Sequence, residues 1–355
     1  MPSASADIAV PSARLLAFAE TLLRKLDVPD NDARATARIL LDADLRGIES
    51  HGMAHLVDFY VRGIQRGLIA ARSDIRVTSD APSAAAIDGG RRLGFVVGHR
   101  AMELAIDKAR ATGVGMVSVG NSTHYGAGAH YAMMALEREM IGISLTTGGR
   151  VMAAPGGRGK AIGLNVIAIA APTSREYPYV LDMATSVVAN GKLEIAARRG
   201  QAIPEGWAID GEGRPVTDPT KVGPNGALLP LGGSPVTGAF KGFGLAIMVD
   251  ILSSALAGVA SSAEERPPFA AAHFFGALRI DAFEPVAQYK ERMEAMIGAL
   301  KSATGPDGDE VRIPGELEHA LSARRRAEGT IPMHARIVDG YRAAAEEFGV
   351  PFDLA

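Results

Sequence analysis

The sequence predicts a mixed α/β protein in which a strand-rich middle domain is inserted into a helical domain built from both chain ends. Apolar residues recur at helical spacing from residue 11 to 70 and again after residue 285, whereas strand-like apolar runs and Gly-rich loops alternate between them. We therefore expect residues 1–75 and 285–355 to form the helical domain and residues 76–284 the middle domain. The 355 residues, 47% of them hydrophobic, can bury a core without disulfides.

The composition excludes several classes of protein. Lys and Arg number 37 against 40 Asp and Glu, so the net charge of −3 gives no basic excess to hold nucleic acid. The chain has no Cys, which excludes a disulfide scaffold, a thiolate nucleophile and an iron–sulfur cluster. The 41 Gly residues indicate many tight turns or close approaches of the backbone to a ligand.

Two segments bear on cellular location. The first ten residues lack the basic start and the long apolar run of a signal peptide. The most apolar stretch, residues 243–260, carries Asp250 near its centre, and a charge there costs about 2.5–3.5 kcal/mol inside a membrane. We therefore expect this stretch to be a helix buried between layers, and the protein to be cytoplasmic without a membrane partner.

The N-terminal helices follow from apolar spacing and start signals. A first helix is expected over residues 12–26, and a second begins where Pro29 and Asp30 provide a start signal. A third is expected after Ser50, a favourable N-cap residue. The apolar face of this third helix comprises Leu56, Tyr60, Ile64 and Leu68.

The middle domain is expected to alternate strands with helices. Strand and turn texture covers residues 75–100, and helices are expected at 101–113 and 129–140. Strands are expected from 114 into a Gly-rich loop, and at 141–147, 163–173, 177–186 and 273–283. Residues 198–236, rich in Pro and Gly, predict an excursion over the surface. The C-terminal helices are expected at 285–303, 316–329 and 335–348.

Familiar ligand-binding motifs are absent from the sequence. The segment Gly126–Tyr131 lacks the third Gly or Ala of a Rossmann fingerprint. Gly159-Lys160 lacks the earlier Gly and the following Ser or Thr of a phosphate-binding loop. His51 and His55 have the spacing of zinc ligands, but Gly52 stands where a zinc protease carries its Glu, and two His alone leave zinc short of ligands. We predict no metal site.

Two histidine-bearing segments are candidate sites. At a helix start, His51 is near the positive end of the helix dipole, which disfavours imidazolium and leaves an acid–base group beside the Ser50 hydroxyl. An N-cap followed by a solvated His explains the same residues, and locally it is the favoured interpretation. Asn121–Gly126 lies where a strand meets a Gly-rich loop, a usual place for a ligand, although a His bonded within its own loop fits equally.

Two further segments carry polar groups that suit a ligand. Asp182–Ser186 ends a strand, where it can bind polar ligand groups or cap its own turn. Lys241 stands among glycines before the apolar helix, where it can reach a phosphate or simply lie on the surface.

Taken in order, these segments resemble one family, the malate/L-lactate dehydrogenases that are unrelated to the Rossmann lactate dehydrogenases. That family also includes sulfolactate and ureidoglycolate dehydrogenases and piperideine-2-carboxylate reductases. The resemblance covers nearly the whole chain. The matching motifs are Asp44–Gly47 with Ser50–Gly52, Asn121–Gly126, Leu181–Ser186 with Gly191-Lys192, Lys241–Leu245, and Ile313–Glu316.

The resemblance implies an oxidoreductase with NAD or NADP as cofactor, a homodimer, and small 2-hydroxy acids or their 2-oxo counterparts as substrates. It also implies a non-Rossmann cofactor domain with a mixed, largely antiparallel sheet. Ser50 and His51 match a hydroxyl–imidazole relay at the substrate carbonyl, and His124 matches a residue also proposed as proton acceptor. The matching cofactor contacts are His124, Tyr125, Gly126, Ala127, Gly128, Gly148, Asp182, Met183, Ala184, Lys241 and Gly242.

On the substrate side, Asn190 and Gly191 match a turn, and one position departs from the family. The family often carries Arg, a natural carboxylate clamp, where this chain has His55. We expect Arg46 and His55 on the substrate side, with Arg46 compensating for the missing Arg or the acid group of the substrate held differently. A second departure is Gly163–Val166, which reads Gly-Leu-Asn-Val where the family usually has Gly-Thr-Asn-Pro.

Three functional hypotheses follow. Lys192 stands where imine reductases of the family tend to carry an acidic residue, which favours a 2-hydroxy acid substrate over a cyclic imine carboxylate. A ligand-binding protein that kept the fold and lost turnover is the alternative from another class. The intact Ser50, His51 and His124 argue against it, and we hypothesise that His51 exchanges the proton while His124 orients cofactor and substrate.

Overall fold

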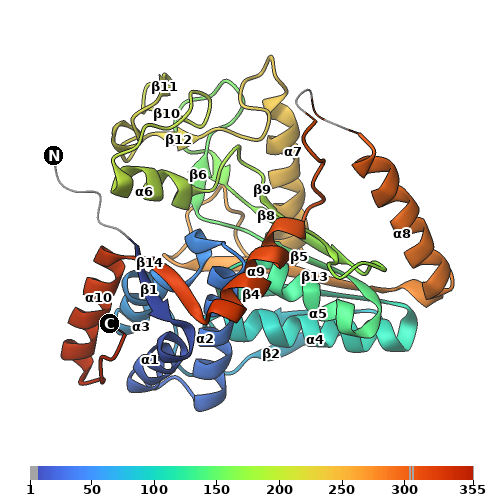
Figure 1. Ribbon diagram of the computed structural model, residues 1–355, viewed down its shortest axis with the longest axis horizontal. Helices are drawn as coiled ribbons and strands as arrows, with labels where there is room; N and C mark the ends of the chain where they lie inside the picture. Colours follow the sequence, from blue (N-terminus) through green and yellow to red (C-terminus); the bar gives the residue numbers. More distant parts are fainter. Residues whose placement is uncertain (1–6, 304, 306–307, 355) are drawn as a thin grey trace.

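A seven-stranded sheet organises the fold, and the computed structural model describes it together with the rest of residues 7–303, 305 and 308–354 (Figure 1). The strands, in their order across the sheet, are β2 (Arg76–Asp80), β3 (Ala84–Asp88), β4 (Val114–Thr123), β13 (Ala270–Arg279), β5 (Met140–Thr146), β8 (Val166–Ala171) and β9 (Tyr179–Ala184). β3 and β4 pair in parallel, and the other neighbours pair antiparallel. The expected mixed, largely antiparallel sheet is confirmed.

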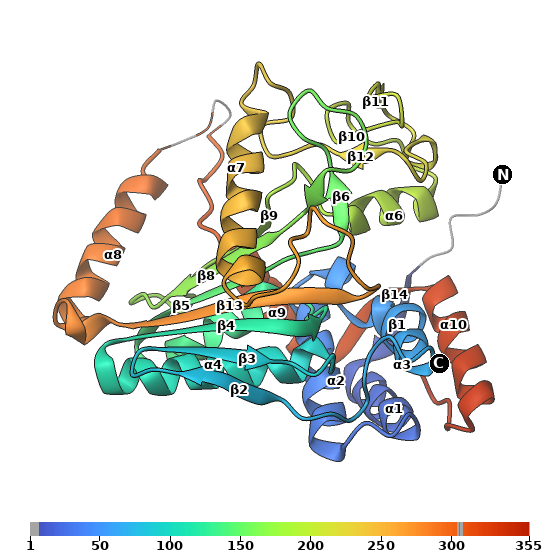
Figure 2. The same cartoon turned by 180° about the vertical axis from the view of Figure 1, so that it is seen from behind.

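Helices cover both faces of this sheet (Figures 1 and 2). α4 (Gly94–Thr112) and α5 (Gly128–Met134) pack on one face, and α7 (Ala239–Asp250) with its π-helical continuation η6 (Ile251–Ala255) packs on the other. Close approach depends on glycine: a Cβ at Gly115 of β4 would lie 1.9 Å from a carbonyl oxygen of α4. The sheet is thus the middle of three layers.

The two chain ends pack together in the structure. β1 (Asp7–Pro11) pairs antiparallel with β14 (Thr330–His334), a small sheet that the helical pattern did not indicate. Around it lie α1 (Ser12–Lys25), α2 (Asp30–Leu45), α9 (Glu316–Glu328) and α10 (Ala335–Phe348). Their buried side chains, such as Leu15 and Tyr341, join one continuous core with Phe275 of the central sheet.

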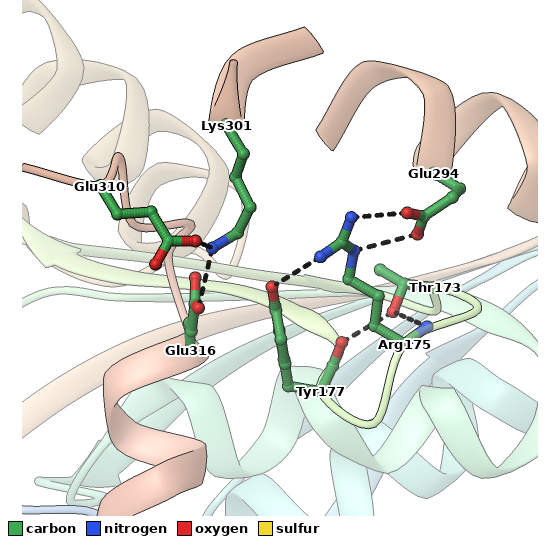
Figure 3. A network of polar contacts seen from close by, with 7 residues as sticks. All are labelled: Thr173, Arg175, Tyr177, Glu294, Lys301, Glu310 and Glu316. Atoms are coloured by element: carbon green, nitrogen blue, oxygen red, sulfur yellow. Dashed lines mark hydrogen bonds and ion pairs between the residues drawn. The ribbon is translucent and has the colours of Figure 1, made fainter. Parts of the chain in front are cut away.

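One helix lies elsewhere than expected. The sequence grouped α8 (Val286–Lys301) with the terminal helices, but both views place it at the opposite end of the molecule from α1 and α10 (Figures 1 and 2). Figure 3 shows how it is held: Arg175 pairs with Glu294, and Lys301 pairs with Glu310 and Glu316. The periodicity of α8 identified a helix, but its single buried residue, Ile297, left its partner unspecified.

The local structure around Ser50 also differs from the expected regular helix. The chain forms two 3-10 turns, then a π-helical turn, and a short α-helix that ends before Leu68. These elements are η1 (Glu49–His51), η2 (Met53–His55), η3 (Leu56–Val61) and α3 (Arg62–Gln65). Ser50 lies inside η1 and caps no helix. Single π-turns are frequent at functional sites, because they re-aim side chains within a helix.

Two further expectations need correction. α4 begins at Gly94, inside the range expected to be strand and turn. α7 is not buried between layers: Ala246 and Val249 face the interior, whereas Phe240 and Ile251 are 61% and 57% exposed. No helix in the described part of the chain is long and apolar enough to cross a membrane.

The excursion expected at 198–236 forms a second, smaller sheet above the first (Figure 1). Its strand order is β11 (Pro215–Val216), β10 (Ala208–Ile209), β12 (Ala227–Leu228), β6 (Arg150–Met152) and β7 (Ile162–Gly163). α6 (Asn190–Arg199) leads into this lobe and brings its N-terminus to the Ser50 segment.

Candidate active site

Hydrogen bonding to Asp44 holds the segment that carries Ser50 and His51 in place. The buried Asp44 carboxylate accepts a hydrogen bond from the Met53 amide at 2.7 Å, and the Tyr341 hydroxyl donates to the Met53 carbonyl. Gly52 is required for this contact, because a Cβ there would lie 2.1 Å from Asp44 Oδ1. The Asp44 side chain therefore supports the segment that carries Ser50 and His51.

Ser50 and His51 form a hydroxyl–imidazole pair. The Ser50 Oγ lies 3.0 Å from His51 Nδ1. His55 Nε2 donates to the Ser50 carbonyl at 2.7 Å, so this nitrogen is committed to the backbone. Gly191, at the start of α6, approaches so closely that a Cβ there would lie 2.7 Å from Ser50 Cβ.

His124 follows β4 and faces the same space as His51. Its Nδ1 lies 2.6 Å from the Tyr60 hydroxyl and accepts the Gly126 amide hydrogen at 3.3 Å. Because Nδ1 acts as an acceptor, the neutral ring carries its hydrogen on Nε2. The rings of His51 and His124 stack, with centroids 5.5 Å apart and planes 21° from parallel. Two imidazoles of different hydrogen-bonding character therefore meet at one point.

Both imidazoles are neutral in the ligand-free protein at neutral pH. Burial, with a smaller contribution from His55, lowers the pKa of His51 to about 4. Burial also lowers the pKa of His124 well below its ordinary value, with smaller contributions from His51 and His55. A neutral imidazole with a free ring nitrogen can accept a proton from a hydroxyl group.

A cavity of about 600 Å³ opens in front of the two histidines. Phe59 forms part of its wall and packs edge-on against His124, with centroids 5.3 Å apart. The remaining walls come from residues 147–151, the start of α6, and the loop 262–271. The cavity has the size of a small organic acid together with the end of a larger ligand.

A second cavity, of about 270 Å³, adjoins the first and shares Ser50, His51, Leu164 and Ala189 with it. Its floor is the Gly-rich segment 126–129, where α5 begins. The Asp182 carboxylate accepts the Ala129 amide hydrogen at 2.8 Å and so joins β9 to this helix start. Burial raises the pKa of Asp182 to about 6.

These features fit a nicotinamide dinucleotide. Bare backbone lines the floor, and a Cβ at Gly128 would lie 2.9 Å from the Tyr125 hydroxyl, so the surface stays open only with glycine. Arg46 lines the same cavity, and its Nε is buried with no hydrogen-bond partner in the described part of the chain. An unsatisfied cationic donor beside an open helix start is the environment that a phosphate or ribose oxygen requires.

The structure brings most of the predicted site residues together. The larger cavity is lined by Ser50, His51, His55, His124, Gly148, Asn190 and Gly191. The smaller cavity is lined by Arg46, Ser50, His51, Gly126, Ala127, Gly128, Asp182 and Ala184. Arg46 is thus on the cofactor side, while the Asn190 amide is bonded to Glu194 at 2.8 Å.

Four predicted residues lie outside both linings. Tyr125 is buried in a ring stack, 4.6 Å from His273. Met183 follows Asp182 on a strand, and successive side chains point to opposite faces of a sheet. Lys241 is exposed in the first turn of α7, and Gly242 allows α7 to approach residues 185 and 231.

Sequence reasoning missed Phe59, Phe269 and Arg266. Phe59 falls within the expected third helix but outside the apolar face that the sequence defined for it. Arg266 and Phe269 lie on the loop before β13, and Arg266-Pro267-Pro268 was the signal that could have drawn attention to it. In the described part of the chain, no three His, Asp or Glu side chains lie close enough to hold a metal ion.

A non-Rossmann α/β fold with paired neutral imidazoles between a substrate-sized cavity and a Gly-lined cavity defines a hydroxy acid oxidoreductase that uses NAD or NADP. The chain belongs to the malate/L-lactate dehydrogenase family, which it matches over residues 10–340. The expected membership is confirmed.

Relatives are similar along their whole length. Malate dehydrogenase of Pyrococcus horikoshii is 44% identical over 351 residues, covering 97% of this chain and 96% of the relative. The (2R)-3-sulfolactate dehydrogenase (NADP(+)) of Chromohalobacter salexigens is 36% identical, covering 92% and 96%. The solved structure of the Pyrococcus horikoshii malate dehydrogenase superimposes with a TM-score of 0.87 at 41% identity, covering 98% of this chain and 97% of that chain.

Proposed function

We propose that the protein interconverts a small 2-hydroxy acid and its 2-oxo acid, with malate, lactate or sulfolactate as the substrate type, and that His51 exchanges the proton. The observation that carries this proposal is the stacked pair of His51 and His124 at the junction of the two cavities. When bound, NAD or NADP supplies hydride acceptance and donation at its nicotinamide ring.

The hydrogen bonds of the two histidines divide their work. His51 Nδ1 faces a Ser50 hydroxyl, which can donate or accept, so its tautomer can change as Nε2 takes up or releases a proton. The Nδ1 of His124 is an acceptor for Gly126, so its Nε2–H can only donate. We infer that His51 accepts the hydroxyl proton in oxidation, and that His124 holds the substrate oxygen by hydrogen bonding.

An assay with a panel of 2-oxo acids tests the proposed activity. Pyruvate, oxaloacetate, sulfopyruvate, 2-oxoglutarate and piperideine-2-carboxylate are each mixed with the protein and with NADH or NADPH, and the loss of reduced nicotinamide absorbance is followed. We expect turnover with at least one open-chain 2-oxo acid. Turnover of the cyclic imine alone would identify an imine reductase, and cofactor binding without any turnover would identify a binding protein.

We further propose that the protein is a cytoplasmic homodimer. The outward face of α7 and η6 carries Phe240, Ile251 and Leu256, which are 61%, 57% and 60% exposed. A contiguous apolar face on a helix favours burial against another chain, and a second copy presents the same self-complementary face. We place the protein in the cytoplasm because soluble nicotinamide cofactors are available to an enzyme there.

The molar mass of the protein, measured by light scattering as it elutes from a size-exclusion column, tests whether it is a dimer. We expect about twice the chain mass of 37.0 kDa at micromolar concentration. Ile251→Asp should shift the mass to that of one chain, because a buried carboxylate without a partner is strongly unfavourable. Leu317→Asp, at a 50% exposed position on α9, is the matched control and should remain dimeric. A wild-type protein with the mass of one chain would contradict the proposal.

A further inference from the structure

Arg266 is a partly buried cation in the wall of the larger cavity. Its Nη1 donates to Thr147 Oγ1 at 2.9 Å, and its Nη2 donates to the Gly148 carbonyl at 2.6 Å. Both acceptors are neutral, and among the described residues no Asp or Glu lies within ion-pair distance of this guanidinium. Burial lowers the pKa of Arg266, and the more distant Asp250 and Glu264 only partly oppose that shift.

The loop that presents Arg266 is anchored at its start. Asp250, the lone carboxylate of the apolar helix α7, accepts from the Ser262 amide at 2.9 Å and from Asn165 Nδ2 at 2.9 Å. Asn165 Oδ1 in turn accepts the Gly148 amide hydrogen at 3.1 Å. One buried network therefore fixes both the loop and the carbonyl that receives the Arg266 hydrogen bond.

The end of the loop is fixed against the histidine side of the cavity. Pro267 and Pro268 restrict the backbone after Arg266. Phe269 has a φ of 67°, a left-handed conformation that an aromatic residue adopts only when its surroundings impose it. Its ring lies 4.4 Å from that of Phe59, which itself packs on His124. The guanidinium is thus held at a defined place in the same cavity as the paired imidazoles.

A guanidinium has five N–H donors in a planar fork and is the preferred partner of carboxylates. Two neutral acceptors leave donors of the guanidinium unused, and the positive charge has no direct ion-pair partner among the described residues. His55 and Arg46, the residues that the sequence suggested for the acid group, are less suited. His55 has its Nε2 committed to the Ser50 carbonyl, and Arg46 lines the smaller cavity rather than the larger.

We propose that Arg266 binds an acid group of the substrate and so takes over the carboxylate clamp that position 55 lacks. This inference rests on the proposed function and adds to it the residue that selects an anionic substrate. The group bound is the carboxylate next to the reacting carbon, or the second acid group of a substrate with two. The shared chemistry is a carboxylate or sulfonate that receives a forked pair of charge-assisted hydrogen bonds.

Kinetics and binding of Arg266→Met and Arg266→Lys test this assignment. Losing a charge-assisted contact should weaken substrate binding by about 10–100-fold. We expect this as a rise in KM, with cofactor affinity unchanged. Lys should rescue only part of the loss, because an ammonium cannot replace the fork. Arg34→Met removes the same charge from an exposed position on α2 and should leave both quantities unchanged.

A comparison of substrates with one and with two acid groups identifies which acid group Arg266 binds. A rise in KM for pyruvate and oxaloacetate alike places the adjacent carboxylate on Arg266, whereas a rise for oxaloacetate alone places the distal group there. Unchanged KM for both, or a loss of cofactor affinity in place of substrate affinity, would overturn the proposal.

A calorimetric titration with oxalate, with and without reduced cofactor, separates this proposal from the activity itself. Oxalate is a planar dianion of the size of a 2-oxo acid and needs no turnover. We expect the wild-type protein to bind oxalate and Arg266→Met to lose oxalate binding. In Arg266→Ala, added guanidinium chloride at a non-denaturing concentration should restore part of the oxalate binding. If no 2-oxo acid turns over but oxalate binding still depends on Arg266, the activity is wrong and the anion site stands. If turnover is found and oxalate binds both proteins equally, the anion site is wrong.

Discussion

Replacement of His51 by Asn lowers turnover by about 10²–10⁴-fold, the usual contribution of a positioned acid–base group, and leaves cofactor affinity unchanged. The reason is geometric: His51 faces both cavities and its ring is hydrogen-bonded to Ser50, whereas the Gly126 amide is bonded to His124. Steady-state kinetics at saturating cofactor, together with a cofactor titration, measure the two quantities separately.

The matched variant is His124→Asn. Because His124 receives the Gly126 amide hydrogen, its loss should loosen the Gly-rich floor and raise the cofactor dissociation constant. The pH dependence separates the two variants further. In oxidation, kcat/KM of the folded wild-type protein should stay level as the pH falls from neutral and decline only toward about pH 4, where the pKa of His51 lies. If the His51 variant keeps this decline at low pH and the His124 variant loses it, His124 and not His51 exchanges the proton.

Acidification from about pH 6.5 to about pH 4 removes a large part of the folding stability. Burial lowers the pKa of His51 and His130 to about 4 and that of His273 to about 3, and it lowers the pKa of His124 in the same direction. The unfolded chain binds protons at these positions near the ordinary pKa of 6.5, and the folded chain does not. Stability is therefore complete above about pH 6.5 and declines as the pH falls toward the folded values.

Two carboxylates oppose this decline. Burial raises the pKa of Asp44 to about 7 and that of Asp182 to about 6, so each stays protonated in the folded state where the unfolded state has lost its proton. They therefore add stability as the pH falls through that range. Four buried histidines lose stability over this range and two carboxylates gain it, so the net effect of acidification is a loss of stability.

Urea unfolding at a series of pH values measures this balance. We expect the free energy of unfolding to fall steeply below about pH 6.5, and the fall to become steeper in Asp44→Asn, which removes one of the opposing groups. An amide can still accept the Met53 hydrogen bond, so the variant should fold. A free energy that is level from neutral pH down to about pH 4 would show that the histidines are not neutral and buried as the structure has them.

Much of the fold could be predicted because its signals are local. The start of α2 at Pro29, the Gly113 stop of α4 and the apolar runs of the central strands each depend on a few neighbouring residues. The placement of α8 depends instead on ion pairs with distant residues, which a periodicity cannot show. The outward face of α7 is as apolar as a buried one, and so it was expected to be buried.

The candidate site likewise contains residues that local motifs predict and a residue whose place depends on distant contacts. Ser50, His51 and His124 stand in motifs that resemble a known family, and the structure brings them to one cavity. Arg266 has no such motif: its place depends on Asp250, which sequence analysis used only to argue against a membrane helix. The regular helix expected after Ser50 was wrong because residue propensities do not encode a π-turn that tertiary packing imposes.

The most direct test of the account follows the transferred hydrogen. The protein is incubated with a 2-oxo acid that it turns over and with NADH or NADPH deuterated at the transferable position of the nicotinamide ring, and the product is examined by mass spectrometry. We expect a 2-hydroxy acid that carries a single deuterium on the former carbonyl carbon. His51→Asn should reduce the turnover without changing the position of the deuterium. A 2-hydroxy acid formed without deuterium at that carbon, or no such product from any 2-oxo acid, would contradict the account.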